Sequence, residues 1–583
     1  MLLLIVILLH YPVIIKTIIT MPTVYYFEAK SIQNYILDSS KLKDMIGASE
    51  QIEYLCHDEA LSNEENKEHL LDKVLNSLGL DDSKVNFARK AGGAFQALFS
   101  NANEAKNFQA VWTFCVQQAF PGLTFAQGMA TDDRLKTALK MARDDLFKHD
   151  HNAFFPQLPL AGPLIARSPR TGQPAVDRSK DRSERLDTTT VKKRDFRDGT
   201  ALINKLDFNK QNIHWPINLD EKDYEKGTDE KTFPLLQNNR YIAIVHADGN
   251  NLGQLLKTIQ DNLLVNEITA AHYAEVLRTY SQAIEKTTVK SAKQAIIDVV
   301  AKGAVWQFTI MPARPLVLAG DDCTFIVRGD LALDFTQVFL EQFEKHSQTQ
   351  LNELKEKYPE LDCLPEKLTA CAGIAYIKAS QPFYQGYNLA ESLCKSAKNF
   401  AKSHVKKEEL VPACLTFHRI TTSIIDNYDT ALEHELRREV GNNKGIQFTM
   451  QPYLVGEVNP SQQPNECIQI DAFKRVLRFF QTAPISHGTF REFLTLLESD
   501  QELADSAMQR WHDNMTKGGK TKLLNTLKEI LEDCQLGNQP SDTLKLVGSE
   551  IKVGAIQYVR TPIGDALALM SISKGGDDVS DSI

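Results

Sequence analysis

Apolar and polar positions along the chain predict strands and helices in a recurring order. The run 240-RYIAIVHADGNNLGQLL-256 is typical of a buried strand that leads into a helix. In 316-LVLAGDDCTFIVRGD-330, apolar residues flank a glycine and two acids, which predicts a hairpin with the acids at its tip. A strand is expected at 369–380, and helical spacing covers 330–358, 386–403 and an insertion around 266–302. This order predicts a ferredoxin-like βαββαβ unit.

The same order of elements occurs earlier in the chain. A strand and helix are expected at 23–37, a hairpin at 90–100, a helix at 103–120 and a strand at 123–130. We therefore interpret the chain as containing one unit twice.

The two copies differ in their acids. Aligning AGGA with AGDD places Gly93 and Ala94 at the positions of Asp321 and Asp322. Aligning 27-FEAKS-31 with 245-VHADG-249 places a lysine, Lys30, at the position of Asp248. We therefore expect the first copy to keep the scaffold and to have no acid at any of the three places.

Composition and charge are those of an ordinary soluble protein. The 583 residues suggest three or four domains, and 43% are hydrophobic and 24% charged. A net charge of -9 argues against a general nucleic-acid coating protein, although it leaves room for a local basic channel. The nine cysteines are scattered without a CxxC pair, which argues against a Cys-rich zinc site and fits a reducing cytoplasm.

The first twenty residues are strongly apolar, which leaves two interpretations open. They could be a membrane anchor or signal sequence, but they lack a positively charged start and carry His10, Pro12 and Lys16. They also run directly into the expected strand at 23–29. We favour Met21 as the true start and a cytoplasmic protein without a membrane partner, with the anchor as the alternative.

Three carboxylates are expected to converge in the second unit. The first strand and the central hairpin are neighbours in a ferredoxin-like sheet, so Asp248 meets Asp321 and Asp322, and Gly320 allows the tight turn. Clustered carboxylates repel unless a cation lies among them, and hard oxygen ligands suit Mg²⁺ or Mn²⁺. Two such ions can hold a nucleotide's phosphates and activate a hydroxyl for in-line attack.

Other residues near the predicted cluster suit phosphate. Gly249 and Gly253 flank Asn250 and Asn251 at a helix start, where free backbone N–H groups favour anions. Two further candidates lie four residues apart on one helix face, Lys398 and Lys402. We expect both lysines to bind the triphosphate tail, with Lys398 exposed, and a solvated helix face is the alternative.

These residues carry a resemblance to a known family. The segments 246-HADGNNLG-253, 313-ARPLVLAGDD-322 and 373-GIAYIKASQPFYQGYNLAESLCKSAK-398 resemble the large polymerase-like subunit of type III CRISPR effector complexes, in particular its pair of Palm domains. The resemblance covers roughly 23–420 and is strongest in 240–403.

The resemblance implies an α+β fold with a definite domain order. The expected parts are an apolar leader at 1–20, a degenerate first Palm domain at 21–155, a connector at 156–236, a second Palm domain at 237–420 and a helical C-terminal domain at 421–583. It further implies that the second Palm joins and cyclises ATP into cyclic oligoadenylate in antiviral defence, with Asp248, Asp321 and Asp322 holding the metals. Its implied partners are other effector subunits with guide and target RNA.

The sequence departs from the family pattern in several places. The hairpin has Ala319-Gly320 where the family has Gly-Gly, and Asn250 stands where the family often has a second acid. We expect no N-terminal HD nuclease, because about 20 residues precede the first strand. The basic, Pro-containing segment 163–197 replaces the family's zinc motif; it is interpreted as a connector or a mobile phosphate-facing segment, with a solvated linker as the alternative.

Two rival functions remain open on the sequence alone. A diguanylate cyclase uses a similar Palm, but its hairpin continues with further acids, whereas Cys323 and Thr324 follow here. A non-catalytic assembly subunit is the other rival, along with a cyclase for another nucleotide. Acids at three places in the second copy favour an enzyme.

Overall fold

The computed structural model describes most of the chain. The described residues are 21–38, 41–56, 69–150, 162–180, 182–197, 199–207, 214–219, 232–236, 240–265, 268–300, 310–406, 409–421, 427–441, 443–457, 467–536 and 544–573. The predicted leader at 1–20 lies outside them. Within these ranges, no helix combines the length and apolar character that a membrane crossing needs.

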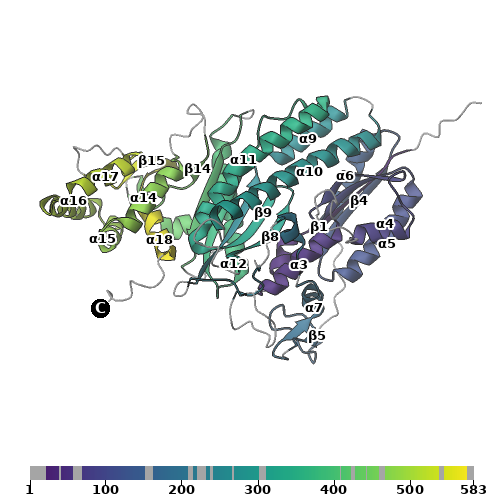
Figure 1. Ribbon diagram of the computed structural model, residues 1–583, viewed down its shortest axis with the longest axis horizontal. Coiled ribbons are helices and arrows are strands. Elements are labelled where there is room, and N and C mark those ends of the chain that lie inside the picture. Colours follow the sequence, from purple (N-terminus) through teal and green to yellow (C-terminus); the bar gives the residue numbers. More distant parts are fainter. Residues whose placement is uncertain are drawn as a thin grey trace, which may run out of the picture.

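The first unit is a four-stranded antiparallel sheet with strand order β2-β3-β1-β4, the ferredoxin-like order (Figure 1). Its elements are β1 (Thr23–Lys30), α2 (Ile32–Leu37), α3 (Leu42–Leu55), α4 (Leu70–Ser77), β2 (Val85–Ala91), β3 (Ala94–Phe99), α5 (Ala102–Ala119), β4 (Thr124–Thr131) and α6 (Leu135–Asp150). Both faces of β1 are buried: Tyr25 and Phe27 pack with α3 and α5, and Val24 packs on the side of α6. This explains why β1 is almost continuously apolar.

The second unit is built on a six-stranded sheet with order β14-β11-β10-β7-β9-β8. Its elements are β7 (Tyr241–Gly249), α9 (Leu252–Leu263), α10 (Ala270–Ala295), β8 (Ala313–Ala319), β9 (Asp322–Arg328), α11 (Ala332–Lys357), β10 (Ala370–Lys378), α12 (Phe383–Ser403), β11 (Ala413–Arg419) and β14 (Tyr453–Val455). The strands β10, β7, β9 and β8 repeat the ferredoxin-like order of the first sheet. The predicted α+β fold with two such units is confirmed.

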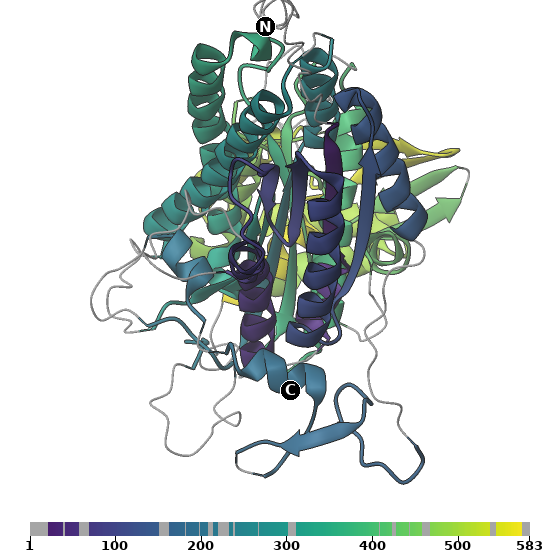
Figure 2. The ribbon, with the colours of Figure 1, turned by 90° about the vertical axis from the view of Figure 1, so that its right-hand side faces the viewer.

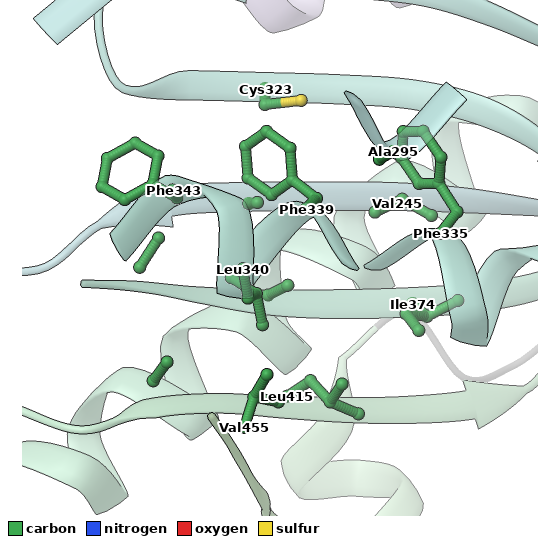
Figure 3. Packing of buried hydrophobic residues seen from close by; sticks show 14 of the residues in the cluster. Val245, Ala295, Cys323, Phe335, Phe339, Leu340, Phe343, Ile374, Leu415 and Val455 are labelled. Atoms are coloured by element: carbon green, nitrogen blue, oxygen red, sulfur yellow. The ribbon is translucent and has the colours of Figure 1, made fainter. Parts of the chain in front are cut away.

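The core of the second unit lies between its sheet and two long helices. Figure 3 shows Phe335, Phe339 and Leu340 of α11 lying over Val245 and Ile374 of the central strands. On the opposite face α12 packs closely, because a Cβ on Gly386 would lie 2.7 Å from the Ile244 side chain. The predicted helical insertion is α10, which packs on α11 and also on β2 of the first unit.

The C-terminal part contains helices, as predicted, and a sheet that the sequence did not suggest. Its helices are α13 (Tyr428–Ala431), α14 (Ile470–Thr482), α15 (His487–Leu497), α16 (Gln501–Lys517), α17 (Thr521–Glu532) and α18 (Ile563–Ser573). Its sheet has order β12-β13-β16-β15, from β12 (Arg437–Gly441), β13 (Lys444–Gln447), β15 (Gly548–Val553) and β16 (Ile556–Arg560). Position 420, the expected domain boundary, falls between β11 and β14, which pair in one sheet.

Part of the expected connector is folded onto the first unit. It forms β5 (Ala175–Arg178), β6 (Arg185–Asp187), α7 (Thr188–Arg194) and α8 (Ala201–Lys205). Lys193 pairs with Asp38 at 2.6 Å, and Arg194 pairs with the fully buried Asp44 at 2.6 Å. The 163–197 segment is therefore not a solvated linker along its whole length, since α7 makes buried ion pairs with the first unit.

The structure keeps the predicted alignment of the two hairpins and corrects that of the first strands by two residues. A Cβ on Gly128 would lie 2.2 Å from the Ala142 carbonyl oxygen, and one on Gly373 would lie 2.1 Å from that of Ala390, so these glycines are equivalent. Gly128 pairs with Tyr26 in the first sheet, and Gly373 pairs with His246 in the second.

The equivalent of Asp248 is therefore Glu28, two residues after Tyr26. The left-handed residues that precede α2 and α9, Ser31 and Asn251, agree with this alignment. The expectation that Lys30 replaces Asp248 was wrong, and the first copy keeps one acid of the three.

The close approach at Gly373 gives a test of the fold. We expect Gly373→Ala to lower the free energy of unfolding by about 3 kcal/mol, because the methyl group would overlap α12 backbone atoms and force the helix off the sheet. Gly253→Ala is the matched control: no atom would lie within 4 Å of its Cβ, and alanine favours a helix. Urea denaturation measures both. Equal stability of the two variants would contradict the packing described here.

Candidate functional site

The ends of two neighbouring strands bring the predicted carboxylates together. Ala247 of β7 pairs with Cys323 of the antiparallel strand β9, so Asp248, which follows Ala247, lies opposite Asp322, which precedes Cys323. Asp321 follows Gly320 in the two-residue turn between β8 and β9. Since side chains alternate along a strand, Asp248 and Asp322 project from the face that carries α12, opposite the core under α11.

Glycines make this arrangement possible. Gly320 has φ of +60°, in the left-handed region that a two-residue hairpin turn requires. A Cβ on Gly249 would lie 2.3 Å from Leu252 and 3.1 Å from the Cβ of Asp321. Only glycine at 249 therefore lets the end of β7 approach the hairpin turn this closely.

Burial and the neighbouring negative charges raise the pKa of Asp321 and of Asp322. Burial, followed by the charges of Asp322 and Asp248, raises the pKa of Asp321 to about 7. Burial and Asp248 raise the pKa of Asp322 to about 6, although Lys398 and Arg89 oppose this. The cluster thus favours binding a cation or a proton.

Lys398 supplies a positive charge within the cluster. Its ammonium group forms an ion pair with Asp248 and donates a hydrogen bond to the Gly249 carbonyl at 2.8 Å. Burial lowers the pKa of Lys398, but Asp248 together with the nearby Cys394 and Asp321 raises it above its ordinary value. The expectation that this lysine is exposed was wrong, because its side chain is 15% exposed. Lys402, one helical turn further along, is exposed.

The start of α9 lies directly after β7. Asn251 precedes the helix in a left-handed conformation, and its side chain forms no capping hydrogen bond. Gly253 is exposed, with no atom within 4 Å of an added Cβ. Asn250 is buried and its amide nitrogen donates to Thr369 Oγ1 at 2.9 Å, so this nitrogen is bound within the fold.

The back of the hairpin is held by residues that the sequence analysis did not identify. Thr288 of α10 donates a hydrogen bond to the Gly320 carbonyl at 2.7 Å. Lys205 of α8, which is 3% exposed, pairs with Glu53 and Glu285 at 2.7 Å each and donates to the Leu318 carbonyl at 3.2 Å. The sequence contains no signal for them, because Lys205 is the last residue of a short helix and Thr288 lies in the polar stretch 285-EKTTVKS-291.

The first unit reaches the site through its own hairpin. A Cβ on Gly92 would lie 3.3 Å from the Cβ of Ala319, so the two hairpin tips lie against each other. Arg89 on β2 lowers the pKa of Asp322 across this contact. Glu28 pairs with Lys30 at 2.7 Å within the first unit.

The donor types fit a hard divalent cation, but the side chains do not form a ready-made metal site. In the described ranges, no three His, Cys, Asp or Glu side chains are arranged to hold one ion. Three carboxylates nevertheless offer oxygen ligands and excess negative charge, and the buried Oδ1 of Asn250 has no hydrogen-bond partner. Two clefts, of about 680 and 580 Å³, lie between α11 and α14 and do not include these carboxylates.

Comparisons with known proteins agree with the motifs. Residues 241–410 match a family described as Cas10/Cmr2, second palm domain. No curated protein matches the chain. Among solved structures, Csm1 in T. onnurineus is similar, with 12% identity, a TM-score of 0.42, and coverage of 95% of this chain and 70% of that one.

Structures of a Csm1-Csm4 cassette are also similar. The complex with cA4 and the complex with one ATP each share 12% identity and a TM-score of 0.37 with this chain, and each covers 65% of it. The chain spans about half the length of these chains, 53% and 54% respectively. The family match and the motif order together confirm the predicted resemblance to the large subunit of type III CRISPR complexes, because residues 241–410 match the second palm domain of Cas10/Cmr2.

Proposed function

We propose that the second palm domain is a nucleotidyltransferase that joins and cyclises ATP into cyclic oligoadenylate, using two Mg²⁺ or Mn²⁺ ions. The observation that carries the proposal is the meeting of Asp248, Asp321 and Asp322 at the ends of β7 and β9, next to the free start of α9. The match to a Cas10/Cmr2 palm domain supports it. We name ATP as the substrate because of that family match, since the carboxylates bind metals and phosphates and do not select a base.

In this proposal the three carboxylates hold the metals, and the remaining residues hold the nucleotide. When bound, the metals would polarise the phosphates and lower the pKa of the attacking hydroxyl. The backbone N–H groups at Asn251 and Gly253 suit a phosphate, because α9 begins there without a side-chain cap. Lys398 and Lys402 would offset the remaining charge of the triphosphate tail.

The proposed mechanism requires Lys398 to exchange partners. In the structure its ammonium group neutralises Asp248. A cation among the carboxylates would take over that role, and Lys398 would be released toward a phosphate. The Lys398–Asp248 pair also favours the alternative of a non-catalytic structural palm, because it lowers the repulsion in the cluster without a metal.

We place the protein among CRISPR effector subunits in antiviral defence, in the cytoplasm, with guide and target RNA as partners of the assembly. The family match of residues 241–410 supports this proposal. Isolating the native protein and sequencing any bound RNA would test it, and purification without RNA or another subunit would contradict it.

Removing charge from the cluster tests the catalytic proposal. We expect Asp321→Asn and Asp322→Asn each to lower ATP turnover with Mg²⁺ or Mn²⁺ to background, because the metals lose a ligand. The metal-free variants should be at least as stable as the parent protein, since like-charge repulsion falls. Product formation from labelled ATP and from labelled GTP, followed by chromatography, measures both activity and base choice.

The first copy provides a matched control for this test. Glu28→Gln removes the acid that is structurally equivalent to Asp248, but this residue has no acidic partners at positions 93 and 94. We expect turnover within about twofold of the parent protein, whereas Asp248→Asn should abolish it. Full turnover in the Asp321→Asn, Asp322→Asn double variant would contradict the catalytic proposal for these acids. The non-catalytic structural palm would then be the better interpretation of the cluster.

Lys398 is the second target. We expect Lys398→Met to raise the apparent KM for ATP at least about tenfold, or roughly 1.4 kcal/mol of lost binding. It should also lower the free energy of unfolding by about 1 kcal/mol, because Asp248 loses its ion pair and the Gly249 carbonyl loses a donor. The exposed Lys395 on the same helix is the control, and Lys395→Met should change neither quantity. An unchanged KM in Lys398→Met would remove this lysine from the nucleotide site.

A further inference from the structure

The β5–β6 hairpin carries a concentration of exposed positive charge. Figure 2 shows this hairpin standing away from the layered body of the protein. The exposed cations on its two strands and the loop between them, here called the basic ribbon, are Arg178, Lys180, Arg182 and Arg185. Among the described residues, none of these four side chains has an ion-pair partner. The whole chain has a net charge of -9, whereas the segment 163–197, which contains the ribbon, has ten lysines and arginines and five acids.

Two of these cations lie directly opposite each other. In the register of the hairpin, Arg178 of β5 pairs with Arg185 of β6, so both side chains project from the same face. Like charges at directly opposite positions destabilise an antiparallel pair, and a two-stranded ribbon is only marginally stable. A bridging anion would convert this repulsion into a favourable contact.

Two of the acids near the ribbon are already engaged elsewhere. Glu184 pairs with Arg194 at 2.8 Å and with Arg170, which ties the hairpin to α7. Asp187 accepts hydrogen bonds from the Thr190 backbone N–H at 3.0 Å and from the Thr171 hydroxyl at 2.8 Å. The remaining acids of the hairpin are Asp177, which is exposed on β5, and Asp181, so the four cations exceed these two acids.

The loop that presents the cations is closed by specific hydrogen bonds. The Ser179 backbone N–H donates to the Glu184 carbonyl at 2.9 Å, and the Glu184 backbone N–H donates to Ser179 Oγ at 2.9 Å. Arg182 has φ of +59° at the turn and donates its backbone N–H to the Ser179 carbonyl at 2.7 Å. The cations therefore project from a defined turn.

We propose that the basic ribbon binds the phosphate backbone of a nucleic-acid strand. Arginine's planar fork matches phosphate oxygens, and neutralising several phosphates releases counterions. The ribbon strands and their loop contain no aromatic residue, so base stacking is not expected and binding should be largely independent of sequence. This site is separate from the carboxylate cluster and does not depend on its proposed chemistry.

Fluorescence anisotropy tests this proposal with the full chain and a labelled, unstructured 20-nucleotide RNA, and in a second arm with DNA of the same sequence. The test variant is Arg178→Gln, Lys180→Gln, Arg185→Gln; Arg182 is kept because of its left-handed backbone. The control, Lys517→Gln, Lys520→Gln, Lys522→Gln, removes the same charge from exposed lysines at the junction of α16 and α17.

We expect the ribbon variant to bind at least tenfold more weakly at 50 mM salt, and the control variant to bind within about twofold of the parent protein. The slope of log Kd against log salt concentration should fall by about 2 in the ribbon variant, because each of the three lost phosphate contacts contributes about 0.7 for a single strand. Equal loss with RNA and DNA identifies the backbone as the ligand, and loss with RNA alone identifies RNA.

Two outcomes would overturn the proposal. One is equal weakening by both triple variants, which would show general attraction to lysines and arginines. The other is the absence of any ribbon effect on nucleic-acid binding, which would leave the ribbon as a surface for an acidic protein. Circular dichroism must show the same fold in all three proteins, and the thermal midpoint of the ribbon variant should not fall, because the Arg178–Arg185 repulsion is removed.

Discussion

Repulsion among three carboxylates at the junction of two strands is the constraint around which the second unit is organised. Asp248, Asp321 and Asp322 lie on adjacent strand ends, where burial and mutual charge raise the pKa of Asp321 to about 7 and that of Asp322 to about 6. A hairpin turn is easily deformed, and such repulsion would push its tip away from β7. The surrounding structure must therefore hold the tip in place as well as offset the charge.

Different parts of the chain perform these two tasks. Lys398 offsets charge from the α12 side, and Arg89 does so from the first unit. Thr288 binds the Gly320 carbonyl, and Lys205 binds the carbonyl of Leu318 while joining Glu53 of the first unit to Glu285 of α10. Because Lys205 is buried between two acids, losing it would leave unpaired charge behind the hairpin, which is costly. The cluster therefore depends on the packing of the two units against each other.

The helices and strands could be predicted from the sequence more accurately than the residue-by-residue alignment of the two units. The hairpin at Gly320 followed from turn chemistry and from flanking apolar runs, and the units followed from the order of elements. The alignment of the hairpins was right, but that of the first strands was wrong by two residues, because side chains alternate with a period of two and such a shift leaves every residue on the same face of the sheet. What decides the alignment is the close approach of α6 to Gly128 and of α12 to Gly373, which is a tertiary contact.

The residues that support the hairpin were missed for a different reason. Lys205, Arg89 and Thr288 come from segments far apart in sequence, and only the docking of the units brings them to the hairpin. The exposure of Lys398 was misjudged because helical spacing identifies a polar face but not what that face contacts. The C-terminal strands β12 and β13 were missed because segments such as 437-RREVG-441 lack the alternation of a half-buried strand.

The difference between the two copies shows how the scaffold separates support from chemistry. In the first copy the hairpin turn is Gly92–Gly93, and the one remaining acid, Glu28, pairs with its neighbour Lys30. This hairpin therefore has no like-charge repulsion to offset, and its tip packs against Ala319 of the second hairpin. The first copy thus retains the tight turn without acidic side chains, and its tip supports the second hairpin. The second copy carries its acidic side chains at the equivalent turn. Because the first hairpin packs against the second, it limits how far the charged turn can move under the repulsion of its own carboxylates.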